Sequence, residues 1–233
     1  MSRKFYDLEY SDGRCFSPYC WRARFALAHK GLEAESVPVR MTDKETIAFS
    51  GSKTVPVLVD GENVVPDSWA IAEYLERAYP DAPSLFGGDT GRATCRFVNS
   101  WCDSQLLRAL FYVIGPDLLA FFLPDDLEYF VRTREKRLGC TFEEMKTQRE
   151  EREEALWNTL APLRLMLSKQ PYIGGEAPAY GDIIVGATLQ WARCSSPIST
   201  IKPDDTPVYD WFQRMLDAYG GIARAMPAHP EAG

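Results

Sequence analysis

Short apolar runs alternate with a one-sided helical pattern at the start of the chain. Apolar residues recur at i, i+4 and i+7 within residues 18–30, which predicts a helix with one buried face. Residues 4–9 and 34–40 flank this helix and are typical of strands, and Pro38 favours an edge position for the second. The pattern predicts a β-α-β unit whose two strands are parallel, because a helical crossover joins them.

A second block of the same size follows. Residues 53–65 hold two apolar runs around Asp60-Gly61, a pair that strongly favours a β-hairpin. The Val55-Pro56 bond opens the hairpin, and a trans bond is favoured because cis prolyl bonds are uncommon. The alternative is a cis bond, which would leave the N–H and C=O of Val55 open to pair with an extended peptide. Apolar spacing after Ser68 then predicts a helix that Pro80 ends.

The pattern changes at a glycine-rich linker, residues 87–91, beyond which it is helical throughout. We expect Gly115-Pro116 to kink or split the first long helix and Pro162 to bend a later one. The chain is therefore predicted to be α/β in its first part and all-α in its second, with helical stretches at 93–122, 124–138, 142–167, 180–191 and 207–219.

Composition narrows the class of protein. The 233 residues carry a net charge of −7, which argues against nucleic acid as a partner, because phosphate binding needs a basic surface. No apolar run reaches the length of a membrane span, and the first residues lack the apolar region of a signal peptide. Six cysteines without a CxxC pair fit reduced thiols, so we expect a cytoplasmic protein. The two histidines have no metal-ligand companions, and we expect no metal.

The start of the first helix is the first candidate for chemistry. Ser17 occupies the expected N-cap and Pro18 the first helical position, where free N–H groups and the helix dipole can stabilise an anion. A thiolate held there would have a lowered pKa and act as a nucleophile. The simpler alternatives are that Ser17 only caps the helix and that Cys20 is a small buried thiol.

Asp67 and Ser68 are the second candidate, because they precede the helix that follows the hairpin. The simpler alternative is that both residues only cap the helix. In the functional alternative, Asp67 binds the ammonium of a ligand, while Ser68 and the helix N-terminus bind its carboxylate.

Together these motifs resemble the cytosolic glutathione transferases over nearly the whole chain. Ser17-Pro18-Tyr19-Cys20 is similar to the CPYC site of glutaredoxins with serine in place of the first cysteine, as in serine-type transferases. The resemblance implies a thioredoxin-like glutathione-binding domain over residues 1–86 and an all-helical acceptor-substrate domain over 92–226. Residues 16–31 and 67–86 look most like the bacterial glutathione-dependent β-etherases and related fungal transferases.

The resemblance also implies roles for single residues. Ser17 would be catalytic, with glutathione as co-substrate. Val55 beside Pro56 would pair with the cysteinyl backbone, Asp67 and Ser68 would hold the γ-glutamyl end, and Lys53 would reach the glycyl carboxylate. Aromatic residues of both domains would form the acceptor pocket, namely Tyr19, Trp101, Phe111, Tyr112, Phe121 and Phe122.

The function so implied is attack of the glutathione thiolate on a hydrophobic electrophile, with cleavage of lignin-type β-aryl ethers as one form, by a homodimer. Two alternatives stay open: a thiol-disulfide reductase that uses Cys20, and a non-catalytic binder of apolar ligands. The chain departs from the family at Ala179, where a capping Ser or Thr usually precedes the buried aspartate, here Asp182.

Overall fold

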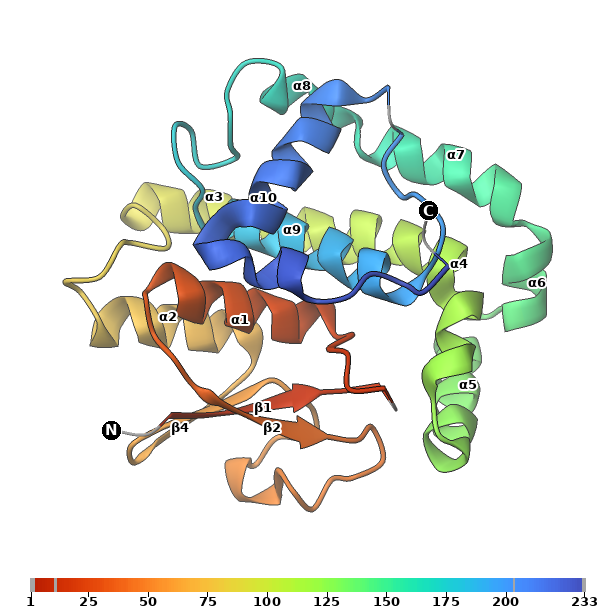
Figure 1. Cartoon of the computed structure of the whole chain (residues 1–233), viewed down its shortest axis with the longest axis horizontal. Coiled ribbons are helices and arrows are strands. Elements are labelled where there is room, and N and C mark those ends of the chain that lie inside the picture. Colours follow the sequence, from red (N-terminus) through yellow and green to blue (C-terminus); the bar gives the residue numbers. More distant parts are fainter. Residues whose placement is uncertain (1–2, 11, 203, 232–233) are drawn as a thin grey trace.

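The computed structural model describes residues 3–10, 12–202 and 204–231. Its first part is a four-stranded sheet in the order β2-β1-β3-β4 (Figure 1). β1 pairs parallel with β2 and antiparallel with β3, and β3 pairs antiparallel with β4. The predicted β-α-β unit and hairpin are confirmed, and Pro38 lies on an edge strand. The strands are β1 (Arg3–Leu8), β2 (Glu35–Val39), β3 (Val57–Asp60) and β4 (Asn63–Pro66).

Two helices, α1 (Pro18–His29) and α2 (Ser68–Ala78), lie between the sheet and the helical half (Figure 1). Trp21 and Phe25 of α1 are almost fully buried, as the spacing predicts. The opposite side of the sheet holds a smaller cluster, in which Ile47 packs against sheet residues. A single 3₁₀ turn, η1 (Ala48–Ser50), follows Ile47, so this face of the sheet carries no long helix of its own.

The second half is helical, and α9 (Tyr180–Ser195) runs through its middle. Almost every residue of α9 is buried, because α1, α3, α4 and α10 surround it (Figure 1). The other elements are α3 (Asp89–Trp101), η2 (Cys102–Leu106), α4 (Leu107–Leu118), η3 (Leu119–Phe121), α5 (Pro124–Leu138), α6 (Phe142–Thr147), α7 (Arg149–Thr159), α8 (Ala161–Leu167) and α10 (Thr206–Ala225).

One helix break lies elsewhere than predicted. α4 continues through Gly115-Pro116, and the irregular stretch is η2, a π-helical segment between α3 and α4. Pro116 has no N–H to donate to the carbonyl of Tyr112, and α4 ends two residues later, at Leu118, where the chain continues as a 3₁₀ turn. The break near Pro162 is confirmed, because α8 starts one residue before it.

α10 bends sharply near its end. Tyr219 and the two glycines after it adopt left-handed backbone angles, so the helical segment after them runs in a different direction (Figure 1). The Tyr219 hydroxyl comes within 3.2 Å of Nδ1 of His29 in α1. Farther on, the backbone N–H of His229 donates to Arg193 O at 2.9 Å, and Arg14 donates to Ala228 O at 3.4 Å. Residues after the bend therefore contact the loop that precedes α1.

Asp182 replaces the missing cap at Ala179 by accepting four hydrogen bonds. Its carboxylate is fully buried and accepts the backbone N–H groups of Ile173 (2.8 Å), Gly174 (2.9 Å) and Ala179 (3.0 Å), and the indole N–H of Trp211 (2.8 Å). Burial raises the pKa of Asp182, and the four donors oppose that shift. One side chain thus fixes the loop before α9 and joins α9 to α10.

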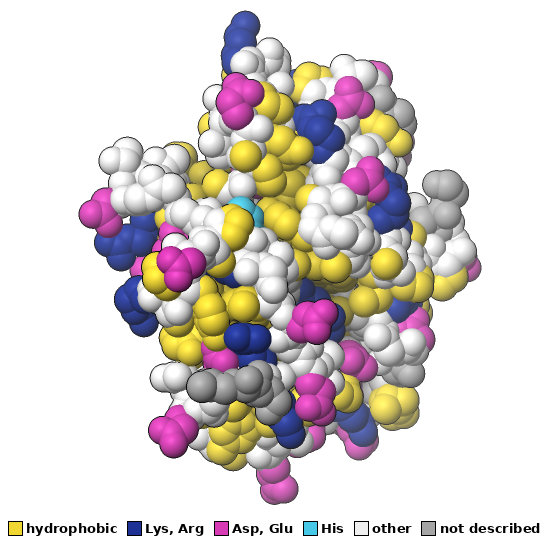
Figure 2. Space-filling view, turned by 60° about the vertical axis from the view of Figure 1, so that its left-hand side comes forward, with side chains coloured by type: hydrophobic (Ala, Val, Ile, Leu, Met, Phe, Trp, Pro, Cys, Tyr) yellow, Lys and Arg dark blue, Asp and Glu magenta, His cyan; other side chains and the backbone are white. Residues whose placement is uncertain are grey.

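The surface carries both signs of charge. Figure 2 shows one face, where acidic and basic side chains are interspersed with hydrophobic patches. None of the helices in the described part of the chain combines the length and the apolar character that a membrane crossing requires.

We expect Asp182→Ala to lower the free energy of unfolding by about 3 kcal/mol or more, because it leaves buried N–H donors without an acceptor. Denaturant unfolding followed by circular dichroism measures the change. Asp210→Ala, at an exposed position of α10, is the matched control and should change stability by no more than about 0.5 kcal/mol. Equal effects of the two substitutions would contradict the role given to Asp182.

Candidate functional site

Ser17 sits at the N-terminus of α1, as predicted. Its backbone is extended, and its hydroxyl oxygen accepts the N–H of Cys20 at 3.3 Å. Pro18 starts the helix, and no acidic residue lies in the first turn. The side chain is almost buried, yet Ser17 lines a cavity between the two halves of the molecule. A polar hydroxyl and the positive end of a helix therefore meet at a place that a ligand can reach.

Cys20 points the other way, into the core. Its side chain is fully buried, and burial raises the pKa of its thiol well above the ordinary value, with the carboxylate of Asp7 adding to the shift. A buried thiol of raised pKa forms little thiolate at neutral pH. This environment argues against a reductase that works through Cys20.

The predicted binding residues for glutathione meet where β3 begins. The Val55-Pro56 bond is cis, so the expectation of a trans bond is wrong. The sequence holds no local signal for the isomer, because cis and trans X–Pro bonds differ by only about 0.5–1 kcal/mol. Pro56 O accepts the backbone N–H of Asp67 at 3.1 Å, which brings the two predicted segments together. Lys53 is exposed on the loop before them.

Asp67 has an unusual backbone for a residue that is not glycine, with φ of 75°. Its exposed carboxylate caps α2 by accepting the N–H groups of Trp69 (2.9 Å) and Ala70 (3.0 Å). Ser68 is buried beside it, and its carbonyl accepts the hydroxyl of Tyr180 from α9 at 2.9 Å. The capping role of Asp67 is thus observed, and one carboxylate oxygen carries both of these bonds.

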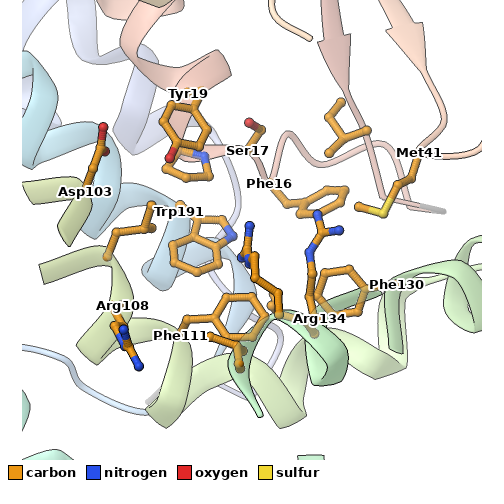
Figure 3. A pocket seen from close by; sticks show the side chains of 16 residues that line it. Phe16, Ser17, Tyr19, Met41, Asp103, Arg108, Phe111, Phe130, Arg134 and Trp191 are labelled. Atoms are coloured by element: carbon orange, nitrogen blue, oxygen red, sulfur yellow. The ribbon is translucent and has the colours of Figure 1, made fainter. Parts of the chain in front are cut away.

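The cavity next to Ser17 has a volume of about 350 Å³ and lies between the halves (Figure 3). The amino-terminal half contributes Leu8, Phe16, Ser17, Pro18, Tyr19 and Met41. The helical half contributes Asp103, Leu107, Arg108, Phe111, Leu118, Phe130, Arg134, Arg137, Leu138 and Trp191. Pockets of this size and apolar lining accept small organic molecules.

Only two of the six predicted pocket aromatics, Tyr19 and Phe111, line this cavity. Trp101, Tyr112, Phe121 and Phe122 lie outside its lining. Phe122 packs on Phe16 with ring centroids 5.3 Å apart, so it supports the wall from behind.

The sequence did not predict that Phe130, Trp191 and two arginines of α5 line the cavity. The arginine-rich run 132–137 has the pattern of a solvated face, and nothing in the sequence indicates that two of its guanidiniums border a cavity. Trp191 is one of many apolar residues in a buried helix, so its place at the cavity depends on how α9 packs.

A mixed four-stranded sheet in the order β2-β1-β3-β4, followed by a helical half, defines a thioredoxin-like domain with a fused helical domain. Comparison with known proteins supports this assignment of the fold. Residues 16–78 match the glutathione S-transferase N-terminal domain, and residues 93–205 match the glutathione S-transferase C-terminal domain. The chain belongs to the cytosolic glutathione transferase superfamily.

Individual relatives resemble different shares of the chain. Glutathione S-transferase Z1 of Arabidopsis thaliana is 44% identical over 69 residues, which span 28% of this chain and 31% of that protein. Glutathione transferase GSTFuA3 of Phanerochaete chrysosporium is 28% identical, with a TM-score of 0.78 over 97% of this chain and 95% of its own. A Ceriporiopsis subvermispora glutathione S-transferase, solved with glutathione, is 24% identical, with a TM-score of 0.80 over 94% and 97% of the two chains.

Proposed function

We propose that the protein is a serine-type glutathione transferase, in which Ser17 keeps the glutathione sulfur ionised for attack on an electrophile in the adjoining cavity. The observation that carries the proposal is the place of Ser17, at the N-terminus of α1 and on the cavity wall. Family membership supports glutathione as the co-substrate. The leucine and aromatic side chains that the helical half places on the cavity suit an acceptor with a hydrophobic part.

Glutathione would lie along the edge of the amino-terminal half. Val55, just before β3, would offer its backbone N–H and C=O to the cysteinyl part of the peptide, as an added strand does. Asp67 would take the ammonium of the γ-glutamyl group, and the N-terminus of α2 at Ser68 would take its carboxylate. Lys53, which is exposed, would reach the glycyl carboxylate.

The chemical step needs a thiolate at neutral pH. A hydroxyl that donates to the sulfur, together with a helix N-terminus, stabilises the charged form and lowers the thiol pKa. A shift of roughly two units corresponds to about 2.7 kcal/mol, within reach of one charge-assisted hydrogen bond and a helix dipole. The proton leaves to solvent, the sulfur forms a bond to carbon, and the leaving group departs with the electron pair of its broken bond.

Replacement of the hydroxyl tests this role of Ser17. In Ser17→Ala we expect the pKa of bound glutathione to rise by about two units and turnover at neutral pH to fall about tenfold to a hundredfold. The thiolate absorbance of the binary complex, titrated with pH, measures the pKa directly. A loss of helix capping alone would lower stability without moving that pKa. Cys20→Ser is the matched control and should retain both the pKa and the turnover. An unchanged pKa in Ser17→Ala would contradict the proposal.

Asp67 can be tested without loss of its cap. Asparagine also caps helices well and tolerates positive φ, so Asp67→Asn removes the charge while it keeps α2 intact. We expect about tenfold weaker binding of glutathione, because a charge-assisted bond to the ammonium is lost. Calorimetric titration measures the affinity, and a melting curve checks that stability is retained. Unchanged affinity would exclude Asp67 as the ammonium partner.

A finer proposal concerns the electrophile. The carbon that bears the aryl ether of a lignin-type dimer is one candidate, and the aromatic walls of the cavity support it. We expect glutathione-dependent release of the phenol from a β-aryl ether dimer, or formation of a conjugate from 1-chloro-2,4-dinitrobenzene, above the rate with glutathione alone. Chromatography of the products distinguishes ether cleavage from conjugation. Binding of apolar dyes without either product would instead favour the non-catalytic alternative.

A further inference from the structure

We propose that the acceptor is an aromatic acid, whose carboxylate is bound by Arg134 and Arg137 while its ring packs on the apolar wall of the cavity. This inference rests on the proposed function and deepens it, because it specifies the class of electrophile. Its basis is a group of guanidiniums at the cavity for which the described residues supply no acidic partner.

Three arginines from two helices border the same cavity. Arg108 comes from α4, whereas Arg134 and Arg137 come from α5, one turn apart. Within residues 3–10, 12–202 and 204–231, none of the three lies within 4.0 Å of a carboxylate oxygen. By contrast, Arg164 binds Asp205 through two nitrogens, one of them at 2.8 Å. The chain as a whole has a net charge of −7, so its composition alone would not lead one to expect three arginines without carboxylate partners around one cavity.

The cavity has one carboxylate of its own, and that group is already paired. Asp103 accepts Nη2 of the buried Arg22 at 2.7 Å through one oxygen. Its other oxygen accepts the amide of Asn99 at 2.9 Å. Arg22 is only 1% exposed, so the removal of its partner would leave a buried charge without compensation. Asp103 therefore stays with Arg22 and leaves the cavity arginines to other anions.

Of the three arginines, Arg134 is the one whose charge a bound anion would stabilise most. Its side chain is half-buried, and it reaches across the cavity from α5 toward Phe16 (Figure 3). Burial and the nearby Arg137 lower the pKa of Arg134, and Arg134 in turn helps to lower the pKa of Lys44. Like charges gathered at a partly desolvated site repel one another, and a bound carboxylate would relieve that repulsion.

The surroundings of Arg134 suit a planar acid. Its guanidinium lies 5.0 Å from the ring centroid of Phe130, and the cavity also presents the rings of Phe16, Phe111 and Trp191. A guanidinium can bind a carboxylate through two parallel N–H donors while the attached ring packs on aromatic neighbours. Arg137, one turn from Arg134 on the same helix, supplies the second guanidinium for the carboxylate. Arg108 is exposed and adds positive charge beside the same cavity, which attracts an incoming anion.

The test uses one electrophile in charged and neutral forms. 4-Chloro-3,5-dinitrobenzoate and its methyl ester share the reacting carbon, from which chloride leaves as the glutathione sulfur bonds. The measured quantity is the ratio of kcat/KM for the acid to that for the ester, each corrected for the uncatalysed rate. Because it is a ratio, general losses of folding or of thiolate formation cancel.

We expect the wild-type ratio to exceed the ratio of the uncatalysed rates, and to fall about tenfold in Arg134→Gln and further in the Arg134→Gln/Arg137→Gln double variant. Arg134→Lys should retain part of the preference, because it keeps the charge and loses the bidentate geometry. Arg132→Gln, on an exposed position of the same helix that does not line the cavity, is the matched control and should leave the ratio unchanged.

Two outcomes would overturn the inference: a wild-type ratio no greater than that of the uncatalysed reaction, and a ratio that the arginine substitutions do not change. In either case, conjugation of the ester would still support the proposed function. A change confined to the KM for glutathione would also overturn it, because the arginines would then bind the tripeptide.

A second measurement does not depend on turnover. Calorimetric titration with 3,5-dinitrobenzoate and its methyl ester, which lack the leaving group, should show tighter binding of the acid in wild type and in Arg132→Gln, and equal binding in the double variant. If neither chlorinated compound reacts, the proposed function fails, whereas the binding preference still decides whether the cavity selects aromatic acids.

Discussion

The ion pair between Arg22 and Asp103 is the contact on which the arrangement of the two halves depends. Arg22 projects from α1 into the helical half, where Asp103 and Asn99 accept hydrogen bonds from its guanidinium. Because a buried cation without a partner is costly, α1 cannot move away from η2 without a large loss of stability. Ser17 lies just before this helix, so the same contact sets where the hydroxyl stands relative to the helical wall of the cavity.

Because this ion pair fixes the two halves relative to each other, one site can combine residues of the sheet-containing half with residues of the helical half. The amino-terminal half supplies a helix N-terminus and strand edges with free backbone groups, which suit a peptide with charged ends. The helical half supplies apolar walls and guanidiniums, which suit a small organic acceptor. Asp103 contributes to both, because its pairing with Arg22 holds the halves together and leaves the cavity without a free carboxylate.

Local patterns were enough to predict most of the fold. The spacing of apolar residues located α1 and α2, and Asp60-Gly61 located the hairpin, because these features depend on neighbours in the sequence. The cis bond at Pro56 and the cavity wall depend on distant contacts instead. Phe121 and Phe122 carry the same aromatic signal as Phe111. In the structure, however, Phe121 packs on Tyr10 and Phe122 packs on Phe16 and Phe130, whereas Phe111 lines the cavity. These contacts join residues far apart in the sequence, so local patterns do not encode them.

The bend at Tyr219 has a consequence for the opposite end of the molecule. The chain beyond the bend reaches the loop that leads into α1, where Arg14 donates to Ala228 O as well as to Cys194 O at 2.5 Å. The loop that leads to Ser17 is therefore held in part by a hydrogen bond to a residue 214 positions farther along the chain.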